Sequence, residues 1–498
     1  MATKTYAPTV QWQADVEQYF TAAFGAEMLQ QISEALCRPP LITSLRVNTL
    51  RSTPEAVVAA LATELAAEKE GQEAPPACAD HRQSLASAHT PFVHQRVPGV
   101  VCMAGSGPHE VDYTPTQGKE VVIARGAGEA VLRGAHIFVP GVLACSPGIQ
   151  KGDLVAVSVA LEQPGGVGRV EMERAQMFRL QHGVAVTMRD PVFRLPSCNG
   201  LLPGLVMPQN LPSILAAHVL APKPGATVLD MCAAPGGKTT ALAELMQDRG
   251  TLYALDRSHA KVQDIRDLAA ELGMTCIRAH KLDATRAVVD HVPAGNGHMQ
   301  AGSGHMQAGT KGATPNGHSS KVAQRQERKR KAMQARGLTI APPPSSVTEA
   351  QIAGFHEATF DYILLDGPCS ALGLRPRLIH GQTLKELRGT ALYQRNFLDT
   401  AIRLLKPGGE LVYSTCTINP GENERNVRHV LDKYPCMSLV PQALTLSGPG
   451  LTGGITHADG EQEQWLTPDE ARLVQRFDPA DAELDTIGFF VAKFVKAK

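Results

Sequence analysis

Two cysteines follow strand-like runs in the C-terminal half of the chain. In the first run, ILLDGPCSALG at 363–373, the apolar residues end at Asp366 and Cys369 follows shortly after. Cys416 ends a second β-like run, GELVYSTC. Most cysteines are packing groups, so neither thiol alone indicates a reaction. Taken by itself, the first stretch favours Cys369 as the reactive thiol because a carboxyl group lies so close to it.

A glycine-rich loop precedes both cysteines. The segment VLDMCAAPGGKTTALAELM at 228–246 has the pattern of a strand, a turn and a helix. A phosphate-binding P-loop would need a glycine where this chain has Cys232, and the dinucleotide pattern G-x-G-x-x-G is missing. The loop therefore argues against a cradle for nucleotide phosphates.

Three acidic residues end successive strand-like runs: Asp256, Asp283 and Asp366. Each of them alone is a common cap or turn residue. The carboxyl ends of parallel strands meet at one crevice, where open α/β sheets bind ligands, and an acid at the position of Asp256 suits two ribose hydroxyls. Combined with a glycine loop that is not built for phosphate, these acids predict S-adenosylmethionine as the cofactor.

A pair of thiols beside a methyl donor suggests pyrimidine chemistry. Carbon 5 of cytosine is a poor nucleophile, but a thiolate that adds at carbon 6 converts the ring into an enamine that can accept a methyl group. The adduct must then lose the carbon 5 proton and release the enzyme. A second ionisable group near the base would assist that release.

The elements that must position these residues alternate between strand and helix patterns over 205–290 and 355–431. This alternation predicts a βαβ architecture with a parallel sheet. We therefore expect an α/β fold, with a Rossmann-like class I methyltransferase domain over 205–498.

A low-complexity segment over about 291–352 interrupts this domain. Its repeated GHMQAG, its Gly and Pro content and its basic stretch at 321–336 predict a disordered insertion. We assign no metal role to His298 and His305, which belong to the repeat, and expect no metal site in the chain.

The N-terminal part divides into two predicted units. Residues 1–95 combine a helical stretch at 9–37, a short strand and an Ala-rich helix, and 63–95 are expected to form a linker or loose insertion. Residues 98–196 contain short β-branched runs broken by Gly and Pro, which predict a small β domain that is inserted into or precedes the methyltransferase domain. We interpret the GAGEAV stretch in this domain as turn glycines rather than a cofactor loop.

Composition sets few limits on function. The chain of 498 residues has 48 basic and 48 acidic side chains, so any nucleic-acid binding must rely on local basic patches. The ten cysteines lack C-x-x-C spacing, which argues against a zinc site or a disulfide scaffold. We expect no signal peptide and no membrane span, and a soluble protein in a reducing compartment.

Several motifs together resemble one enzyme family. LDMCAAPGGKTT, ALDRS, LDGPCSALGLRP and VYSTCTINPGENE, in this order, resemble the Sun-domain (Nop/Sun) RNA cytosine-5 methyltransferases, and RVNTLR at 46–51 resembles their N-terminal segment. GAGEAVLRGAHIFVPGV resembles a PUA domain, an RNA-binding β fold, and its place before the methyltransferase resembles the PUA-bearing branch of the family.

The resemblance implies roles for individual residues. Cys416 would be the nucleophile at carbon 6 and Cys369 would assist product release, while Asp366 and Lys238 would recognise the edge of a cytosine flipped out of its stack. Asp256 would hold the ribose and Asp283 would lie near the adenine of S-adenosylmethionine. The cofactor-binding set comprises Cys232, Ala233, Ala234, Pro235, Gly236, Gly237, Lys238, Asp256, Asp283 and Asp366.

The PUA-bearing branch also implies a substrate. It suggests a tRNA methylated near its 3′ acceptor end, with the CCA terminus gripped by the PUA domain, and mRNA as a further substrate. Arg125, Arg133 and His136 are candidate RNA contacts; the alternative is that they are solvated surface charges. We expect a cytoplasmic monomer, with nuclear access through the basic stretch at 321–336.

The chain departs from the family pattern at one loop. The family usually has alanine before the Pro-Cys-Ser-Gly-x-Gly motif, whereas Gly367 precedes Pro368 here and Ala371 replaces the first glycine after the serine. If this position requires a positive φ, Ala371 costs about 1 kcal/mol. Both thiols and Asp366 are retained, so we expect activity.

Two other function classes fit parts of the sequence. A methyltransferase acting on proteins or small molecules would leave the second thiol and the PUA-like domain unexplained. An RNA-binding scaffold with a relic cofactor fold would leave the acids, the glycine loop and both cysteines unexplained.

Overall fold

The computed structural model describes residues 6–70, 90–159, 163–198, 200–289, 352–457 and 460–498. One large sheet carries the predicted α/β architecture, in the strand order β13-β12-β11-β14-β15-β20-β16, with β19 also paired to β20. Strands β13, β12, β11, β14 and β15 run parallel, whereas β20 pairs antiparallel with both β15 and β16. The chain moves from β11 outward to β13 and then returns to β14 beside β11, which creates a topological switch point between β11 and β14.

The bounds of these elements agree with the predicted alternation. The strands of the large sheet are β11 (Thr227–Asp230), β12 (Thr251–Asp256), β13 (Ile277–Lys281), β14 (Phe360–Asp366), β15 (Leu405–Thr415), β16 (Met437–Leu439), β19 (Val474–Phe477) and β20 (Phe489–Lys496). The helices are α7 (Leu211–Leu220), α8 (Gly237–Leu245), α9 (His259–Leu272), α11 (Leu384–Leu404), α12 (Glu424–Lys433) and α13 (Pro468–Ala471), with the short η3 (Ala284–Arg286). A β17–β18 hairpin (Gly454–Thr456, Gln462–Gln464) stands apart from the sheet.

Helices cover both faces of the large sheet. Val228 and Leu364 face one side and belong to a core that also contains α7 and α8, whereas Leu229 and Ile363 face the other side, toward α11 and α12. Adjacent residues thus enter different cores, as expected for strands buried on both faces. This burial explains the apolar runs VL in β11 and ILL in β14.

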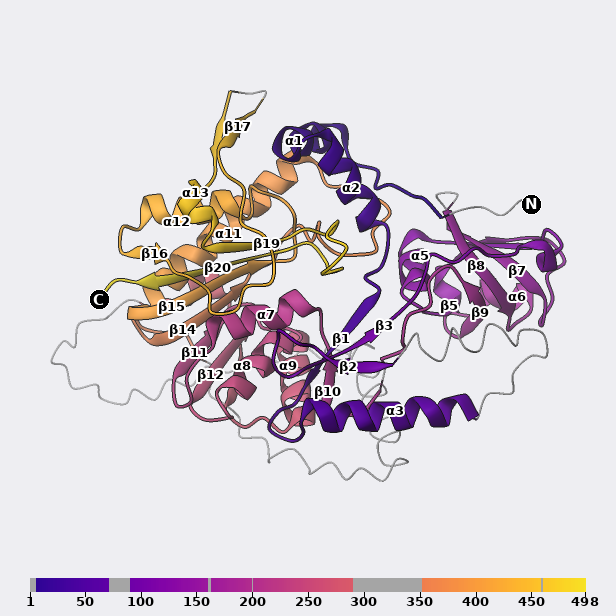
Figure 1. Cartoon of the computed structure of the whole chain (residues 1–498), viewed down its shortest axis with the longest axis horizontal. Coiled ribbons are helices and arrows are strands. Elements are labelled where there is room, and N and C mark those ends of the chain that lie inside the picture. Colours follow the sequence, from indigo (N-terminus) through magenta and orange to yellow (C-terminus); the bar gives the residue numbers. More distant parts are fainter. Residues whose placement is uncertain (1–5, 71–89, 160–162, 199, 290–351, 458–459) are drawn as a thin grey trace, which may run out of the picture.

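A second, four-stranded sheet links the N-terminal segment to the rest of the molecule. Its order is β10-β1-β3-β2, with bounds Val206–Pro208, Ile42–Val47, Val100–Ala104 and Pro91–Val93. Residues between β3 and β10 form the separate β unit that lies beside the α/β domain in Figure 1. Ser106 and Arg194, at the two ends of this unit, pair with N–O distances of 2.9 Å in both directions. The β unit is therefore an insertion whose entry and exit are adjacent.

The inserted unit contains a six-stranded sheet in the order β5-β9-β8-β7-β4-β6. Its elements are η1 (Thr114–Thr116), β4 (Glu120–Ile123), α5 (Arg125–Leu132), β5 (Ile137–Phe138), η2 (Val139–Gly141), β6 (Val142–Cys145), β7 (Leu154–Val159), β8 (Gln163–Val170), α6 (Arg174–Arg179) and β9 (Val184–Pro191). The expected start at 98 differs from this arrangement, because β3 pairs with β1 and belongs to the four-stranded sheet.

Our interpretation of GAGEAV as turn glycines is wrong. These residues form α5, in which Gly126 and Gly128 lie within the helix. A Cβ atom at Gly128 would come within 2.5 Å of Val159, so this glycine permits α5 to pack closely on β7. Tertiary packing therefore overrides the low helix propensity of glycine.

Two N-terminal expectations also need correction. The helical stretch at 9–37 is two helices, α1 (Ala14–Phe24) and α2 (Ala26–Leu36), because Gly25 breaks it with a φ of 82°. The segment expected to be loose from 63 contains the end of α3 (Pro54–Glu70) and also β2. The predicted insertion at 291–352 lies almost entirely outside the described residues.

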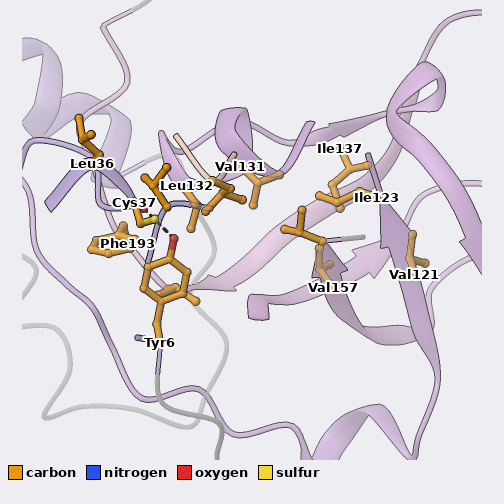
Figure 2. Packing of buried hydrophobic residues seen from close by; sticks show 14 of the residues in the cluster. Tyr6, Leu36, Cys37, Val121, Ile123, Val131, Leu132, Ile137, Val157 and Phe193 are labelled. Carbon is orange, nitrogen blue, oxygen red and sulfur yellow. Dashed lines mark hydrogen bonds between the residues drawn. The ribbon is translucent and has the colours of Figure 1, made fainter. Parts of the chain in front are cut away.

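The N-terminal segment packs against the inserted unit. Figure 2 shows Tyr6 beside Phe193, and their rings meet edge to face at 5.3 Å. The Tyr6 hydroxyl donates a 2.8 Å hydrogen bond to the Cys37 carbonyl. This buried cluster continues through Leu132 to Val157 inside the β unit, so the N-terminus and the insertion share one core.

Candidate active site

The glycine loop connects β11 to α8 at the switch point. Gly236 has a φ of 110°, which explains a glycine there, and α8 begins at the next residue. Asp230 is almost fully buried below the loop and accepts hydrogen bonds from the Thr239 hydroxyl at 2.8 Å and the Cys232 amide at 3.4 Å. Burial raises the pKa of Asp230 to about 6. This carboxyl group holds the loop against the first turn of the helix.

A cavity of about 710 Å³ opens beside this loop. Its lining includes seven of the predicted cofactor-binding residues: Cys232, Ala233, Ala234, Pro235, Gly237, Lys238 and Asp366. Residues from the N-terminal segment and the inserted β unit complete the wall, among them Thr43 and Arg133. The cavity is thus a junction of all three parts of the chain.

The other predicted cofactor residues lie along the same edge of the sheet. Asp256 ends β12 and accepts a hydrogen bond from the Ser258 amide at 3.2 Å, with Lys261 at 3.9 Å. Asp283 follows β13 and caps η3 by accepting from Thr285. Gly236, Asp256 and Asp283 are not among the residues that line the cavity.

These groups fit S-adenosylmethionine. Carboxylates at the ends of neighbouring strands can accept hydrogen bonds from ribose hydroxyls and an amino group, and the loop brings uncharged backbone close to the ligand. The cavity has the size of a small-molecule site.

The two cysteines meet at the carboxyl ends of β14 and β15. Their Sγ atoms are 3.3 Å apart, and both residues are half-buried. A hydrogen bond from Cys369, with help from the Lys238 ammonium, lowers the pKa of Cys416, whereas the same bond and burial raise the pKa of Cys369. The pair therefore favours a thiolate on Cys416 and a neutral thiol on Cys369.

Lys238 and Asp366 form an ion pair beside the thiols. The Lys238 Nζ atom lies 2.7 Å from Asp366 Oδ2, and the Ser414 hydroxyl donates to Asp366 Oδ1 at 2.7 Å. Both charged residues line the cavity. Together they present a fixed donor and acceptor where the edge of a base could bind.

Sequence reasoning missed the buried residues that hold the two thiol loops together. Glu422 is fully buried and accepts hydrogen bonds from Ser370, Asn419 and Gln394. Glu422 and Asn419 stand in the motif VYSTCTINPGENE, but Asn, Gly, Pro and Glu after a strand are typical of an exposed turn, so their burial could not be predicted from the sequence.

The departure at Ala371 has a structural consequence. Ala371 has a φ of 57°, in the left-handed region that favours glycine. Gly373 keeps its glycine, and a Cβ atom there would clash with the Gly488 carbonyl at 2.0 Å. Position 371 therefore requires a positive φ, as the prediction of a strained alanine assumed.

The three candidate RNA contacts occupy different positions. Arg133 is exposed and lines the cavity. Arg125 donates a 2.7 Å hydrogen bond to the Ile379 carbonyl and thus bridges the β unit and the α/β domain. His136 is exposed on the β unit, where its Nδ1 accepts from the Met188 amide at 3.3 Å.

Other site classes find no support within the part of the chain that the structure describes. Those residues contain no cluster of three or more His, Cys, Asp or Glu side chains that could hold a metal ion. No helix among them is both long and apolar enough to cross a membrane.

The switch-point crevice and its glycine loop define a class I S-adenosylmethionine-dependent methyltransferase, and two adjacent thiols lie at the ends of the neighbouring strands β14 and β15. Comparison of the sequence with models of known protein families identifies two matches. The model described as 16S rRNA methyltransferase RsmB/F matches residues 217–295 and 317–495, and the PUA domain model matches 119–192. The chain belongs to this family of Sun-domain RNA cytosine-C5 methyltransferases and carries a PUA domain.

Relatives that match nearly the whole chain support the same family. The chain is 41% identical to the rRNA (cytosine-C(5))-methyltransferase NOP2C of Arabidopsis thaliana, over 98% of this chain and 91% of the relative. It is 32% identical to the mouse tRNA (cytosine(72)-C(5))-methyltransferase NSUN6, over 99% and 97%. The crystal structure of NSun6 from Pyrococcus horikoshii with SFG, an S-adenosylmethionine analogue, superposes with a TM-score of 0.70 at 29% identity, covering 98% of this chain and 99% of that one. The protein is therefore an enzyme that uses S-adenosylmethionine and acts on RNA.

Proposed function

We propose that this enzyme forms 5-methylcytosine in tRNA near the 3′ acceptor end, through a covalent bond between Cys416 and the base. The observation that carries the proposal is the 3.3 Å contact between the two thiols, in which Cys416 has the lowered pKa. The full-length similarity to mouse NSUN6, which is named for tRNA cytosine 72, supports tRNA as the substrate.

Catalysis would begin with a cytosine flipped out of its stack, because its carbon 5 and carbon 6 are inaccessible in a stacked helix. Lys238 and Asp366 line the cavity, whereas Cys369 and Cys416 are not among its lining residues, so the base would reach past this ion pair to the thiols. Lys238 and Asp366 would hold its polar edge. The Cys416 thiolate would then form a bond to carbon 6, and the electrons of the C5–C6 double bond would become available at carbon 5. S-adenosylmethionine, bound by the glycine loop with Asp256 and Asp283, would supply the methyl group.

Release would reverse the thiol addition. Solvent water would accept the proton that carbon 5 loses, the C5–C6 double bond would form again, and the C6–S bond would break with its electron pair returning to Cys416. The Cys369 thiol lies 3.3 Å from the departing sulfur, so its S–H can stabilise the thiolate that leaves. Cys369 therefore serves product release, while Cys416 is the nucleophile.

The PUA domain would hold the CCA end while the adjacent cytosine enters the cavity. Arg133 supports this arrangement because it lies on the PUA domain and lines the same cavity as Lys238. His136 would contact RNA at the exposed face of the domain, and Arg125 would contact RNA while fixing the domain through Ile379. We further propose a monomeric, cytoplasmic enzyme that can also act on mRNA; the basic stretch at 321–336 lies outside the described residues.

Two cysteine variants test the covalent mechanism. With a tRNA transcript and S-adenosylmethionine, we expect Cys416→Ala to abolish both methylation and covalent trapping. We expect Cys369→Ala to accumulate an RNA–protein adduct on denaturing gels. Full activity of Cys416→Ala, or no adduct with Cys369→Ala, would overturn the role assignment.

A second candidate substrate is rRNA, because the chain is 41% identical to a relative named as an rRNA methyltransferase. Bisulfite sequencing of total RNA from cells with and without the protein separates the two. Loss of 5-methylcytosine at an acceptor-end tRNA position supports the proposal, whereas loss confined to rRNA would replace tRNA with rRNA.

A further inference from the structure

Glu422 lies in the turn between β15 and α12 and is fully buried. Its carboxylate accepts a hydrogen bond from the Ser370 amide at 2.9 Å and another from the Ser370 hydroxyl. Asn419 Nδ2 donates to it at 2.9 Å, and Gln394 Nε2 donates at 2.8 Å. Ser370 follows Cys369 in sequence, and Asn419 lies in the turn after Cys416. One carboxylate therefore joins the two thiol loops.

The donors are themselves held in place. Gln394 Nε2 also donates to the Pro368 carbonyl at 3.0 Å, and its Oε1 accepts from Asn426 at 2.9 Å. The Ser370 and Thr417 hydroxyls are 2.7 Å apart. Cys369 thus has residues fixed by the network on both sides, Pro368 and Ser370. The Gly373 amide also donates to the Cys416 carbonyl at 3.0 Å and joins the two loops through the backbone.

Four donors converge on this one side chain, which suits an ionised carboxylate because it only accepts. Burial raises the pKa of Glu422, and the bonds from Ser370, Asn419 and Gln394 oppose that rise. The Glu422 charge helps to keep the pKa of Cys369 high and acts in the same direction on Cys416, so the lowered pKa of Cys416 depends on the hydrogen bond from Cys369.

We propose that Glu422 is a positioning residue that holds the Cys369 thiol within hydrogen-bonding reach of Cys416, and thereby sets the rate at which the cytosine adduct resolves. The inference rests on the proposed covalent mechanism and adds a residue to it. Glu422 touches neither base nor cofactor in this role; it acts through the backbone on either side of Cys369.

Glu422→Gln isolates this role because the side chains have nearly the same shape. The amide nitrogen of glutamine would face at least one donor of the network, so the loop carrying Cys369 must shift. We expect adduct release to slow by about tenfold, the size of effect typical of one buried polar group left unsatisfied. Adduct formation by Cys416 should change less, so the ratio of adduct to methylated product should rise.

The experiment uses the full-length enzyme, a tRNA transcript and labelled S-adenosylmethionine, and measures adduct on denaturing gels against methyl incorporated. Glu424→Gln is the matched control. Glu424 is equally buried and pairs with Arg476 at 2.9 Å, and Arg476 in turn donates to the Ile418 carbonyl after Cys416. Among the described residues its carboxylate makes no hydrogen bond to Ser370, Asn419 or Gln394, so it does not touch the loop that carries Cys369. Its adduct-to-product ratio should equal that of the wild type even if its stability falls.

The outcomes separate two failures. If Cys369→Ala traps an adduct but Glu422→Gln keeps the wild-type ratio, the positioning role is wrong and the covalent mechanism stands. If Cys369→Ala traps no adduct, the covalent mechanism itself fails. Should Glu422→Gln not fold, Ser370→Ala removes only the hydroxyl donor of the network, and an unchanged ratio in that variant overturns the inference.

Discussion

At the scale of single residues, the proposed covalent chemistry depends on which of two similar thiols carries the charge. The contact between Cys369 and Cys416 shifts the two pKa values in opposite directions, because one sulfur donates the hydrogen bond and the other accepts it. The donor stays neutral, and the acceptor is stabilised as a thiolate.

Removing the donor should therefore be visible without any RNA. In Cys369→Ala, the pKa of Cys416 should rise because its main stabilising bond is lost. A thiolate reacts and a thiol does not, so the pH midpoint of Cys416 alkylation by iodoacetamide should move to higher pH than in the wild type. Mass spectrometry of the Cys416 peptide measures this, with the half-buried Cys436 as an internal control. An unchanged midpoint would contradict the charge assignment.

Ala371 predicts a gain in stability. Its φ of 57° strains a residue with a Cβ atom, so Ala371→Gly should raise the free energy of unfolding by about 0.5–1 kcal/mol. Urea denaturation checks this. The exposed Ala270 in α9 is the control, because Ala270→Gly near the end of a regular helix should lower stability. A loss of stability in Ala371→Gly would mean that the left-handed backbone is not strained.

At the scale of elements, the docking of α5 on the PUA sheet depends on which of its two glycines faces the strands. Gly128 meets Val159, whereas a Cβ atom at Gly126 would meet nothing within 4 Å. The same substitution at two positions of one helix should therefore have different effects on stability.

Gly128→Ala should destabilise the protein by about 1–3 kcal/mol through overpacking. Gly126→Ala should be neutral or stabilising by up to about 1 kcal/mol, because alanine favours the helix. Thermal unfolding of the two variants provides the comparison. Equal effects at both positions would contradict the close packing of α5 on β7.

At the scale of the whole molecule, binding of RNA by a chain with a formal net charge of zero must depend on local charge. The cavity where the PUA domain, the N-terminal segment and the methyltransferase domain meet is lined by Arg133 and by the glycine loop that ends at Lys238. A phosphate contact there would contribute a salt-dependent part of the affinity.

Arg133→Ala should weaken tRNA binding and reduce the slope of log affinity against log salt by about one, as expected for the loss of one phosphate contact. Fluorescence anisotropy over a salt series measures both quantities. Arg169→Ala is the control, because Arg169 already pairs with Glu171 at 3.0 Å on the PUA surface. Identical slopes for Arg133→Ala and the wild type would remove Arg133 from the RNA interface.

The amino-acid sequence by itself determined the alternation of strands and helices, the glycine loop, and the acids at strand ends, since these depend on local patterns of burial and turn formation. Tertiary structure decided what local patterns cannot encode. Gly128 is tolerated within α5 because its lack of a Cβ atom lets Val159 pack against the helix. Strand β3 pairs with β1, which is distant in the sequence, rather than with the PUA sheet. The relation between Cys369 and Cys416 likewise exists only once β14 and β15 lie side by side and Glu422 joins the loops that follow them.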